Sequence, residues 1–265
     1  MKMRFKKMHG LGNDFVMVTD MPAGVALPAL AKRLCDRRTG IGADGLILVH
    51  PSQTADVRMQ IINSDGSEAG MCGNGIRCFA KYVYEAGIVK TPDMKIETPS
   101  GIRDAHCDME NGVVARVTIE MGRPVFLSDG VCSTAIDGEQ VFYWPLDTGV
   151  PHAVVPVEDP TDRRHMQTGA KLEWAEPFPQ GTNVDFIKVL DRKNILMRVW
   201  ERGCGETLCC GTGATASAAA AMREGLVDDE VQVRLTLGAL TIRQEDGVCF
   251  MTGPAEYVYE GEIEL

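Results

Sequence analysis

Apolar and polar positions follow two distinct patterns along this chain. Short runs rich in apolar residues predict β-strands at residues 57–62, 94–98, 113–119, 195–200, 231–237 and 248–251. Ile76, Phe79, Ala80 and Val83 recur at helical spacing, which predicts a helix with one face toward a core. A second helix is expected around residues 214–222, where almost every side chain is small. Small side chains permit close packing, so we expect each helix inside a wrap of strands, although the alanines could instead reflect helix propensity alone.

The expected elements recur in the same order in the two halves of the chain. Six features of the first half match features of the second half. The pairs are Gly12 with Gly149, residues 42–49 with 181–189, Asn63 with Glu201, Glu68 with Glu206, Cys72 with Cys210, and Gly87 with Gly225. Chance similarity of glycine-rich turns is the alternative, because the chain has 28 glycines. Matching offsets at many positions favour duplication of one unit. A pocket for a small molecule is then expected between the halves.

Length and composition exclude several classes of protein. A chain of 265 residues can form two domains with proper cores, and 45% hydrophobic and 24% charged residues are ordinary for a globular protein. The net charge is −10, without a basic block, so nucleic acid is not an expected partner. The sequence shows neither a secretory signal nor an apolar run of about 20 residues. We therefore expect a cytoplasmic protein that does not bind membranes.

Nine cysteines are the chemically unusual feature of the composition. They are Cys35, Cys72, Cys78, Cys107, Cys132, Cys204, Cys209, Cys210 and Cys249. Their odd number and scattered spacing do not indicate a disulfide framework, and the absence of a C-x-x-C pair gives little support to structural zinc. Most of them are expected to pack as small hydrophobic residues. Cys72 and Cys210 differ, because each precedes Gly-x-Gly at the start of a predicted helix.

A thiol at the start of a helix has chemical consequences. Unpaired backbone N–H groups and the helix dipole favour thiolate there, and the same N–H groups can bind a carboxylate. Two such half-sites on one substrate would suit an amino-acid racemase or epimerase, in which a thiolate removes the α-proton and an opposite thiol returns one. His152 and Glu201 are candidates for tuning the thiol pKa values. The alternatives are a surface histidine beside Pro151 and a strand-end acid paired with Arg202.

The chain resembles the diaminopimelate epimerase family from residue 5 to the end. The resemblance is carried by residues 8–15, 63–68, 72–78, 201–207 and 210–213. It implies an α/β (α+β) fold of two pseudo-symmetric domains, each a mainly antiparallel β-sheet wrapped around a central helix. The implied boundaries are 1–122 with Cys72, 123–253 with Cys210, and a final strand at 254–265 that returns to the first domain. The implied activity interconverts LL- and meso-diaminopimelate, for lysine and peptidoglycan precursors, in a homodimer without pyridoxal phosphate or metal. Residues 258–261 resemble a segment used in dimer contacts.

The resemblance also implies roles for individual residues. Cys72 and Cys210 would be the acid/base pair, with His152 and Glu201 modulating their pKa values. The backbone amides of Gly73, Asn74, Gly211 and Thr212 would hold the α-carboxylate. Asn13, Asn63 and Asn183 would bind polar groups of the substrate, Glu201 would contact the reacting amino acid, and Arg202 would bind the distal carboxylate. No metal or cofactor site is implied.

Other functions remain open from the sequence. Val150 and Gly45 stand where many or some family members carry an amide side chain, so a racemase of another amino acid, such as histidine or proline, is the nearest alternative. A thiol redox or metal-binding protein would use Cys204, Cys209 and Cys210, although Cys209 is expected to be a packing residue. Phosphate binding by the glycine-rich residues 70–75 is a weaker alternative, because no Gly-Lys-Ser/Thr follows.

Overall fold

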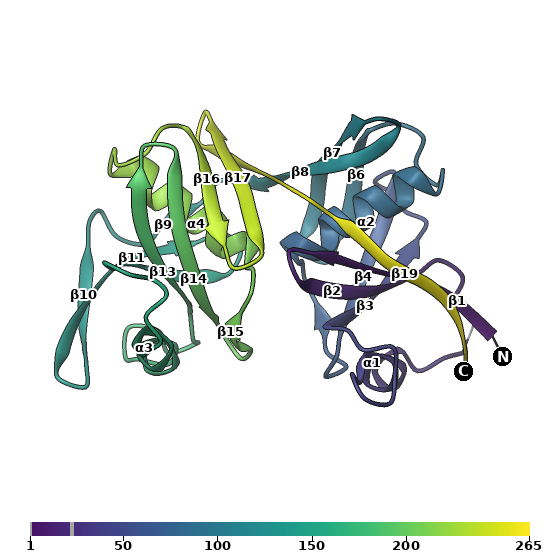
Figure 1. The fold of residues 1–265 in the computed structure, drawn as a ribbon, viewed down its shortest axis with the longest axis horizontal. Helices are drawn as coiled ribbons and strands as arrows, with labels where there is room; N and C mark the ends of the chain where they lie inside the picture. Colours follow the sequence, from purple (N-terminus) through teal and green to yellow (C-terminus); the bar gives the residue numbers. More distant parts are fainter. Residues whose placement is uncertain (1, 22–23) are drawn as a thin grey trace. The chain divides into compact units, whose positions relative to one another are not determined.

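The computed structural model describes residues 2–21 and 24–265, which form a mixed α/β structure dominated by strands. Contacts divide the chain into two units. One unit runs to Ile119 and also takes in Gly253–Leu265, and the other comprises Glu120–Thr252. Within the described residues, each unit has one long and one short helix (Figure 1). Among the described residues, no helix is long and apolar enough to cross a bilayer.

The first unit is built on β1, β2 and the strands that follow them. Its elements are β1 (Lys2–Gly10), β2 (Asn13–Val18), α1 (Leu27–Cys35), β3 (Gly45–His50), β4 (Val57–Asn63), β5 (Glu68–Ala69), α2 (Gly73–Glu85), β6 (Asp93–Thr98), β7 (Gly101–Glu110), β8 (Val113–Gly122) and β19 (Glu256–Glu264). β2 pairs in parallel with β3, and β4 in parallel with β6, while β3–β4, β6–β7 and β7–β8 are antiparallel. β1 lies antiparallel to both β2 and β19, so the last strand of the chain completes this unit.

The second unit repeats this topology. Its elements are β9 (Val125–Phe126), β10 (Cys132–Ile136), β11 (Glu139–Asp147), β12 (Pro151–Pro156), α3 (Arg164–Leu172), β13 (Asn183–Asp191), β14 (Asn194–Glu201), β15 (Gly205–Thr207), α4 (Gly211–Arg223), β16 (Glu230–Leu235), β17 (Gly238–Glu245) and β18 (Val248–Gly253). β12–β13 and β14–β16 are parallel, and β13–β14, β16–β17 and β17–β18 are antiparallel. The duplication inferred from the sequence is therefore visible in the pairing pattern.

The strand register corrects one detail of that alignment. Gly45 lies opposite Asn63 in the first unit. In the second unit Val184 lies opposite Trp200, which brings Asn183 to the level of Glu201. Asn183 therefore corresponds to Gly45, one residue later than the match of residues 42–49 with 181–189 placed it. A side chain of the second unit thus stands where the first unit has only backbone.

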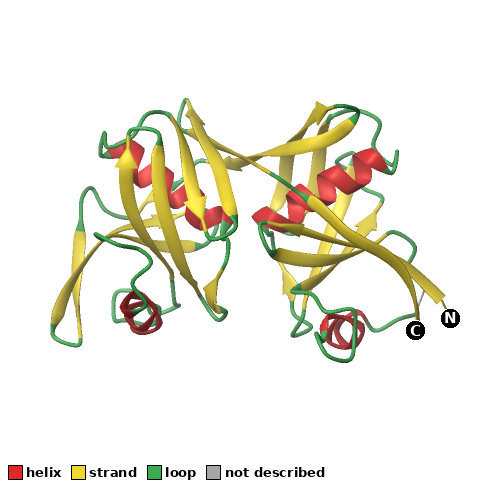
Figure 2. Cartoon of the chain, in the orientation of Figure 1, coloured by secondary structure: helices red, strands yellow, loops and turns green. Residues whose placement is uncertain are grey.

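The long helix of each unit lies among its strands, as Figure 2 shows. α2 packs against β1 to β4 and β7, and its predicted stripe of Ile76, Phe79, Ala80 and Val83 is fully buried. Burying a large apolar side chain of this kind contributes about 1.5–3 kcal/mol. α4 packs against β11 to β14, β16 and β17, and its side chains from Ala214 to Ala221 are all buried. The small residues of α4 therefore serve close packing, and helix propensity alone does not explain them.

The ends of these helices are set by local chemistry. Cys72 and Cys210 are the N-cap residues of α2 and α4, in extended conformations. Gly87 and Gly225 follow the helices at φ +69° and +68°, the left-handed region that glycine adopts without strain. The glycine stops are confirmed. The strand expected at 231–237 was too long, because it ends at Leu235 and a turn leads into β17.

The short helices α1 and α3 were not expected from the sequence. α1 buries Leu30, Ala31, Leu34 and Cys35 and packs against β3 and β4. Leu27, Leu30, Ala31, Leu34 and Cys35 recur at helical spacing, so the apolar pattern carried the signal for this helix, although the helix is only nine residues long. α1 also leads into the loop that carries Arg37 and Asp44, two residues that matter for the site in this unit.

Candidate active site

Cys72 has the local structure that the sequence predicted for a thiol at a helix start. Its backbone is extended, at φ −139° and ψ 118°, and its carbonyl oxygen accepts the first helical hydrogen bond, from Ile76 N at 2.9 Å. The Gly75 amide donates to Cys72 Sγ at 3.4 Å. The sulfur thus takes the place that a serine or aspartate oxygen usually fills at an N-cap. The peptide N–H groups of Gly73 and Asn74 lie in the same first turn.

Cys210 repeats this arrangement at the start of α4. Its backbone is at φ −121° and ψ 114°, and Gly213 N donates to Sγ at 3.3 Å. The Thr212 hydroxyl lies 3.3 Å from the same sulfur. A Cβ atom on Gly213 would lie 2.3 Å from Asp185 Oδ1, so only glycine fits beside that carboxylate. Gly211 and Thr212 begin the helix, as Gly73 and Asn74 do in the first unit.

The surroundings of Cys210 oppose ionisation of its thiol in this state. Burial raises the pKa of Cys210 well above its usual value, and the charges of Glu201 and Asp185 raise it further. Hydrogen bonds from Thr212 and Gly213 lower that pKa but do not compensate. The expectation that a helix start would favour thiolate is therefore wrong for Cys210, because burial and two neighbouring carboxyl groups outweigh the helix.

Glu201 is the carboxyl group in contact with Cys210. It ends β14, and it is joined by hydrogen bonds to the side chains of Thr207 and Cys210. Burial raises the pKa of Glu201, against the lowering effect of these hydrogen bonds. The alternative interpretation, an acid paired with Arg202, is not what the structure shows, because Arg202 Nη1 donates to the Gln180 carbonyl at 3.0 Å. A buried carboxyl group in contact with a thiol can exchange a proton with it.

His152 is fully buried and held by a carboxylate from the neighbouring strand. Its Nδ1 lies 2.7 Å from Asp185 Oδ2, and Asp185 is also fully buried. The interpretation of His152 as a surface histidine is therefore wrong. Within the described part of the chain, Asp185 Oδ1 has no hydrogen-bond partner. A charged residue between Val184 and Phe186 in an apolar strand was the available signal for Asp185.

Asn183 connects His152 to the chain around Arg202. Its Oδ1 accepts from Arg202 N at 2.8 Å, and its Nδ2 donates to the Pro151 carbonyl at 3.2 Å. His152 Nε2 lies 3.5 Å from the same Nδ2. In the first unit, Ser64 is the residue equivalent to Arg202. Its backbone amide donates to the backbone carbonyl of Asp44 at 2.9 Å, instead of to a side chain. Hydrogen bonds thus join His152 to Asp185 and Asn183, and Glu201 to Cys210, while the charges of Asp185 and His152 act on Glu201.

The first unit gathers a different set of residues around its cysteine. Asn13 Oδ1 accepts from Cys72 Sγ at 3.4 Å and from Asn74 Nδ2 at 3.2 Å. Asn63 lies farther along the same unit, at the end of β4, where its Nδ2 donates to Ser67 Oγ at 3.0 Å. Two of the three asparagines expected to bind substrate therefore hold other parts of the protein in this state, and Asn13 holds the thiol itself.

The remaining cysteines are free thiols in the structure. Burial raises the pKa of Cys78 and of Cys107 to about 12, and that of Cys35 to about 11, so these thiols are poor nucleophiles near neutral pH. Cys209 is buried and Cys204 is exposed. No cluster of metal-ligating side chains is found among residues 2–21 and 24–265.

Comparison with known proteins places the chain in a family. The family model described as diaminopimelate epimerase matches residues 5–127 and 145–258. The diaminopimelate epimerase of Caldanaerobacter subterraneus subsp. tengcongensis is 45% identical over 275 residues, covering 99% of this chain and 100% of the relative. That of Moorella thermoacetica is 46% identical over 279 residues, with 99% and 100% covered.

Solved structures show the same fold. A probable proline racemase from Agrobacterium radiobacter K84 superposes with a TM-score of 0.76 at 18% identity, covering 99% of this chain and 93% of that one. A hydroxyproline epimerase from Agrobacterium vitis gives 0.75 at 18% identity, with 99% and 92% covered. These likenesses confirm the expected α/β class of sheets around central helices. With the family match and the full-length relatives, they lead to one conclusion: the chain belongs to the diaminopimelate epimerase family, a family of isomerases.

Proposed function

We propose that the protein interconverts LL- and meso-diaminopimelate by inverting one α-carbon, with Cys72 and Cys210 as the acid/base pair. The observation that carries this proposal is the equivalent placement of the two thiols. Each is the N-cap of the central helix of its unit, with a backbone amide donating to its sulfur. The substrate is inferred from the full-length relatives, which are diaminopimelate epimerases.

The proposed reaction balances without an added reagent. One cysteine acts as thiolate, takes the α-proton and becomes a thiol, while the bonding electron pair moves toward the α-carboxylate. The other cysteine donates its proton to the opposite face of the α-carbon and becomes a thiolate. The backbone N–H groups of Gly73, Asn74, Gly211 and Thr212 are suited to stabilise the negative charge on the carboxylate, because they lie in first helical turns.

Glu201, His152 and Asp185 would set the proton balance of the second unit. Glu201 is in contact with Cys210 and can accept its proton when a substrate ammonium group enters. Asp185 accepts a hydrogen bond from His152 Nδ1, which leaves Nε2 as the imidazole atom directed to other partners. Since both side chains are fully buried, the Asp185 carboxylate holds the His152 ring in one orientation.

Selectivity would depend on residues at the edges of the two half-sites. Arg202 is proposed to bind the distal carboxylate, and Asn13, Asn63 and Asn183 the other polar groups. Val150 and Gly45 provide no amide side chain, and a Cβ on Gly45 would lie 3.2 Å from the Ile62 carbonyl oxygen, which leaves little room there. These two positions are the reason to test substrates directly.

The proposed substrate is tested by α-proton exchange in D₂O with a panel of amino acids. LL-diaminopimelate is expected to give the fastest deuterium incorporation, carried by the epimerised product, followed by meso-diaminopimelate as the reverse substrate. Proline and histidine serve as the competing substrates, and lysine as a control without the distal carboxylate. Faster exchange with proline or histidine than with LL-diaminopimelate would replace the substrate assignment by that of another racemase.

We further propose a cytoplasmic homodimer. The support for the dimer is the resemblance of residues 258–261 to a dimer-contact segment, together with exposed apolar side chains on β19, Tyr257, Val258 and Tyr259. Sedimentation of the wild-type protein and of Tyr259→Lys should give a dimer and a weakened dimer, respectively. A wild-type monomer at micromolar concentration would contradict the dimer, and cell fractionation tests the location.

A further inference from the structure

The Asn13 side chain lies between a carboxylate and a catalytic thiol. Its Nδ2 donates to Asp44 Oδ2 at 2.7 Å. On the other side, its Oδ1 accepts from Cys72 Sγ at 3.4 Å and from Asn74 Nδ2 at 3.2 Å. The amide of Asn13 is therefore the connection between Asp44, in the loop before β3, and the cysteine at the start of α2.

The orientation of this amide is determined independently from its two ends. A carboxylate only accepts hydrogen bonds, so the NH₂ group of Asn13 must face Asp44. A guanidinium only donates, and Arg77 Nη2 lies 2.9 Å from Asn74 Oδ1, so the NH₂ group of Asn74 must face Asn13. Both constraints direct Asn13 Oδ1 toward Cys72 and exclude the flipped amide.

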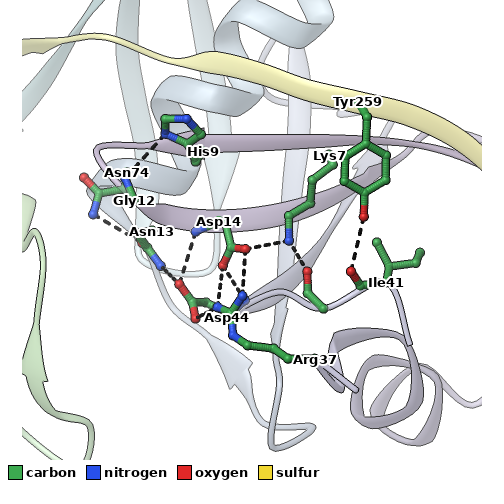
Figure 3. A network of polar contacts seen from close by, with 11 residues as sticks. Lys7, His9, Gly12, Asn13, Asp14, Arg37, Ile41, Asp44, Asn74 and Tyr259 are labelled. Atoms are coloured by element: carbon green, nitrogen blue, oxygen red, sulfur yellow. Dashed lines mark hydrogen bonds and ion pairs between the residues drawn. The ribbon is translucent and has the colours of Figure 1, made fainter. Parts of the chain in front are cut away.

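Asp44 is itself held in place by a charged network, drawn in Figure 3. Arg37 Nη2 donates to Asp44 Oδ1 at 2.8 Å, and the two Nη atoms of Arg37 donate to both oxygens of Asp14, at 3.0 and 2.7 Å. The Asp14 amide donates to Asp44 Oδ2 at 3.1 Å. Lys7 Nζ lies 2.6 Å from Asp14 Oδ2. Burial raises the pKa of Asp14, but hydrogen bonds from Arg37 and Lys7 outweigh it and lower that pKa to about 2, so Asp14 stays ionised beside Arg37.

The fixed amide has a consequence for the proton on Cys72. A carbonyl oxygen can accept a hydrogen bond from a thiol but cannot donate one to a thiolate. We propose that Asp44 is a positioning residue, which holds the Asn13 carbonyl oxygen against Cys72 so that this cysteine rests as a hydrogen-bonded thiol. The inference rests on the proposed function, in which Cys72 is one of the acid/base pair, and it makes Cys72 the partner that begins protonated.

The second unit lacks this arrangement. There the neighbours of the sulfur are the Thr212 hydroxyl, which can donate, and the carboxyl group of Glu201. In the first unit the Asp44 carbonyl oxygen accepts from Ser64 N, whereas in the second unit the Asn183 side chain accepts from the equivalent amide, Arg202 N. The Asn183 Nδ2 donates to the Pro151 carbonyl oxygen. The two half-sites are therefore duplicated in backbone and different in the groups that handle the proton.

Other charged or titratable groups surround Cys72 and stay unchanged in the test. They are Asp14, Arg37 and Lys7 behind Asp44, Arg77 and the buried thiol of Cys78 on α2, and His9 on β1, whose Nδ1 accepts from Gly12 N at 3.4 Å. Because Asp44 is charged, its removal could act on the thiol through the field alone. The experiment must separate that effect from the orientation of Asn13.

The test measures the pH midpoint of iodoacetamide alkylation at Cys72, by peptide mass spectrometry, in the full-length protein without substrate. Asp44→Asn allows the Asn13 amide to turn its NH₂ group toward the sulfur. We expect the Cys72 midpoint to fall by about half to one pH unit, the size of one hydrogen bond. Exposed Cys204 is the internal reference and should keep its midpoint. Asp104→Asn, which removes an exposed carboxylate paired with Lys95, is the matched charge control and should change nothing.

A double-mutant cycle with Asn13→Ala decides between orientation and charge. Asn13→Ala alone removes the acceptor and should lower the Cys72 midpoint, even if Asp44→Asn fails to fold. Added to Asn13→Ala, Asp44→Asn should give no further shift. An equal shift in both backgrounds, or an unchanged midpoint in Asn13→Ala, would overturn the inference. Alkylation needs no turnover, so failure here is distinguishable from failure of the proposed reaction, which the D₂O panel measures.

Discussion

At the residue scale, Cys72 and Cys210 share a backbone position and differ in their surroundings. Both are extended N-caps whose sulfur accepts from the amide three residues later. Cys72 faces the carbonyl oxygen of Asn13, whereas Cys210 lies beside Glu201 and the hydroxyl of Thr212. Inversion needs a base and an acid at the same moment, so different surroundings are chemically useful.

Replacing either cysteine should abolish turnover and preserve the fold. We expect Cys72→Ala and Cys210→Ala each to lower kcat with LL-diaminopimelate by at least about 10³-fold, since each removes one proton-transfer group. Unfolding midpoints should change by only a few degrees, because a small side chain, buried at Cys210 and half-buried at Cys72, is replaced by a smaller one. Cys204→Ala, at an exposed position, is the control and should retain activity. Near-normal turnover in either variant would contradict the role of that thiol.

Glu201 predicts a pH dependence of stability. Its pKa is raised above the ordinary 4.5 by burial, so the unfolded chain releases the proton first as the pH rises. Stability is therefore lost from about pH 4.5 up to the folded-state pKa. Glu201→Gln removes this loss. The melting temperature of the variant minus that of the wild type should therefore increase as the pH rises through that window. Thermal melts from pH 4 upward measure it, and a difference that is constant or shrinks with pH would be the contrary result.

At the element scale, the starts of α2 and α4 use glycine for different reasons. A Cβ on Gly213 would lie 2.3 Å from Asp185 Oδ1 and 2.8 Å from Met197 Cε, inside the contact limit of a buried carboxylate. A Cβ on Gly75 would meet the flexible ends of Ile47 and Ile61, at 3.1 and 3.3 Å. The second helix is therefore the less tolerant one.

This difference predicts an order of stabilities. Gly213→Ala should lower the free energy of unfolding by about 2 kcal/mol, because Asp185 cannot move without disturbing His152. Gly75→Ala is the matched control and should lie within about 1 kcal/mol of wild type, since helix propensity offsets a small clash. Urea unfolding measures both. Equal losses in the two variants would show that the Asp185 contact does not limit the site.

Local signals account for the parts of the structure that the sequence could predict. The stripe on α2, the cysteine caps and the glycine stops each depend on residues close together in the chain. The contacts of His152 with Asp185 and of Asn13 with Asp44 join residues 33 and 31 positions apart. They exist because two parallel strands align in a particular register, which apolar patterning does not specify. The raised pKa of Cys210 also depends on such contacts, because burial and the charges of Glu201 and Asp185 cause it, and apolar patterning does not specify them.

At the scale of the whole molecule, the last strand is structurally part of the first unit. β19 pairs with β1 along nearly its full length, from Lys2 opposite Glu264 to His9 opposite Glu256. Just before it, the Pro254 carbonyl accepts from Arg77 Nε at 3.2 Å, on the buried side chain that also orients Asn74. The C-terminal segment thus supports the surroundings of Cys72.

Removal of residues 254–265 should therefore destabilise one unit selectively. The β1 edge would be exposed and Arg77 would lose a buried partner, at a cost of about 1–3 kcal/mol for that group alone. Amide hydrogen exchange should show lost protection in β1 to β4, with protection retained in β12 to β14. The exposed pair Lys2 and Glu262, altered by Glu262→Gln, is the mild control. An equal loss of amide protection in both units would contradict the claim that the last strand stabilises the first unit alone.

The central claim is that one thiol removes the α-proton and the other supplies a different one. Single-turnover conversion of LL-diaminopimelate in D₂O, followed by mass spectrometry of the separated isomers, tests it most directly. Two acid/base groups on opposite faces predict that the first meso product carries deuterium at the inverted carbon, while the remaining substrate stays protiated. Product that retains the original hydrogen would mean a single group acting on both faces, and would contradict the account.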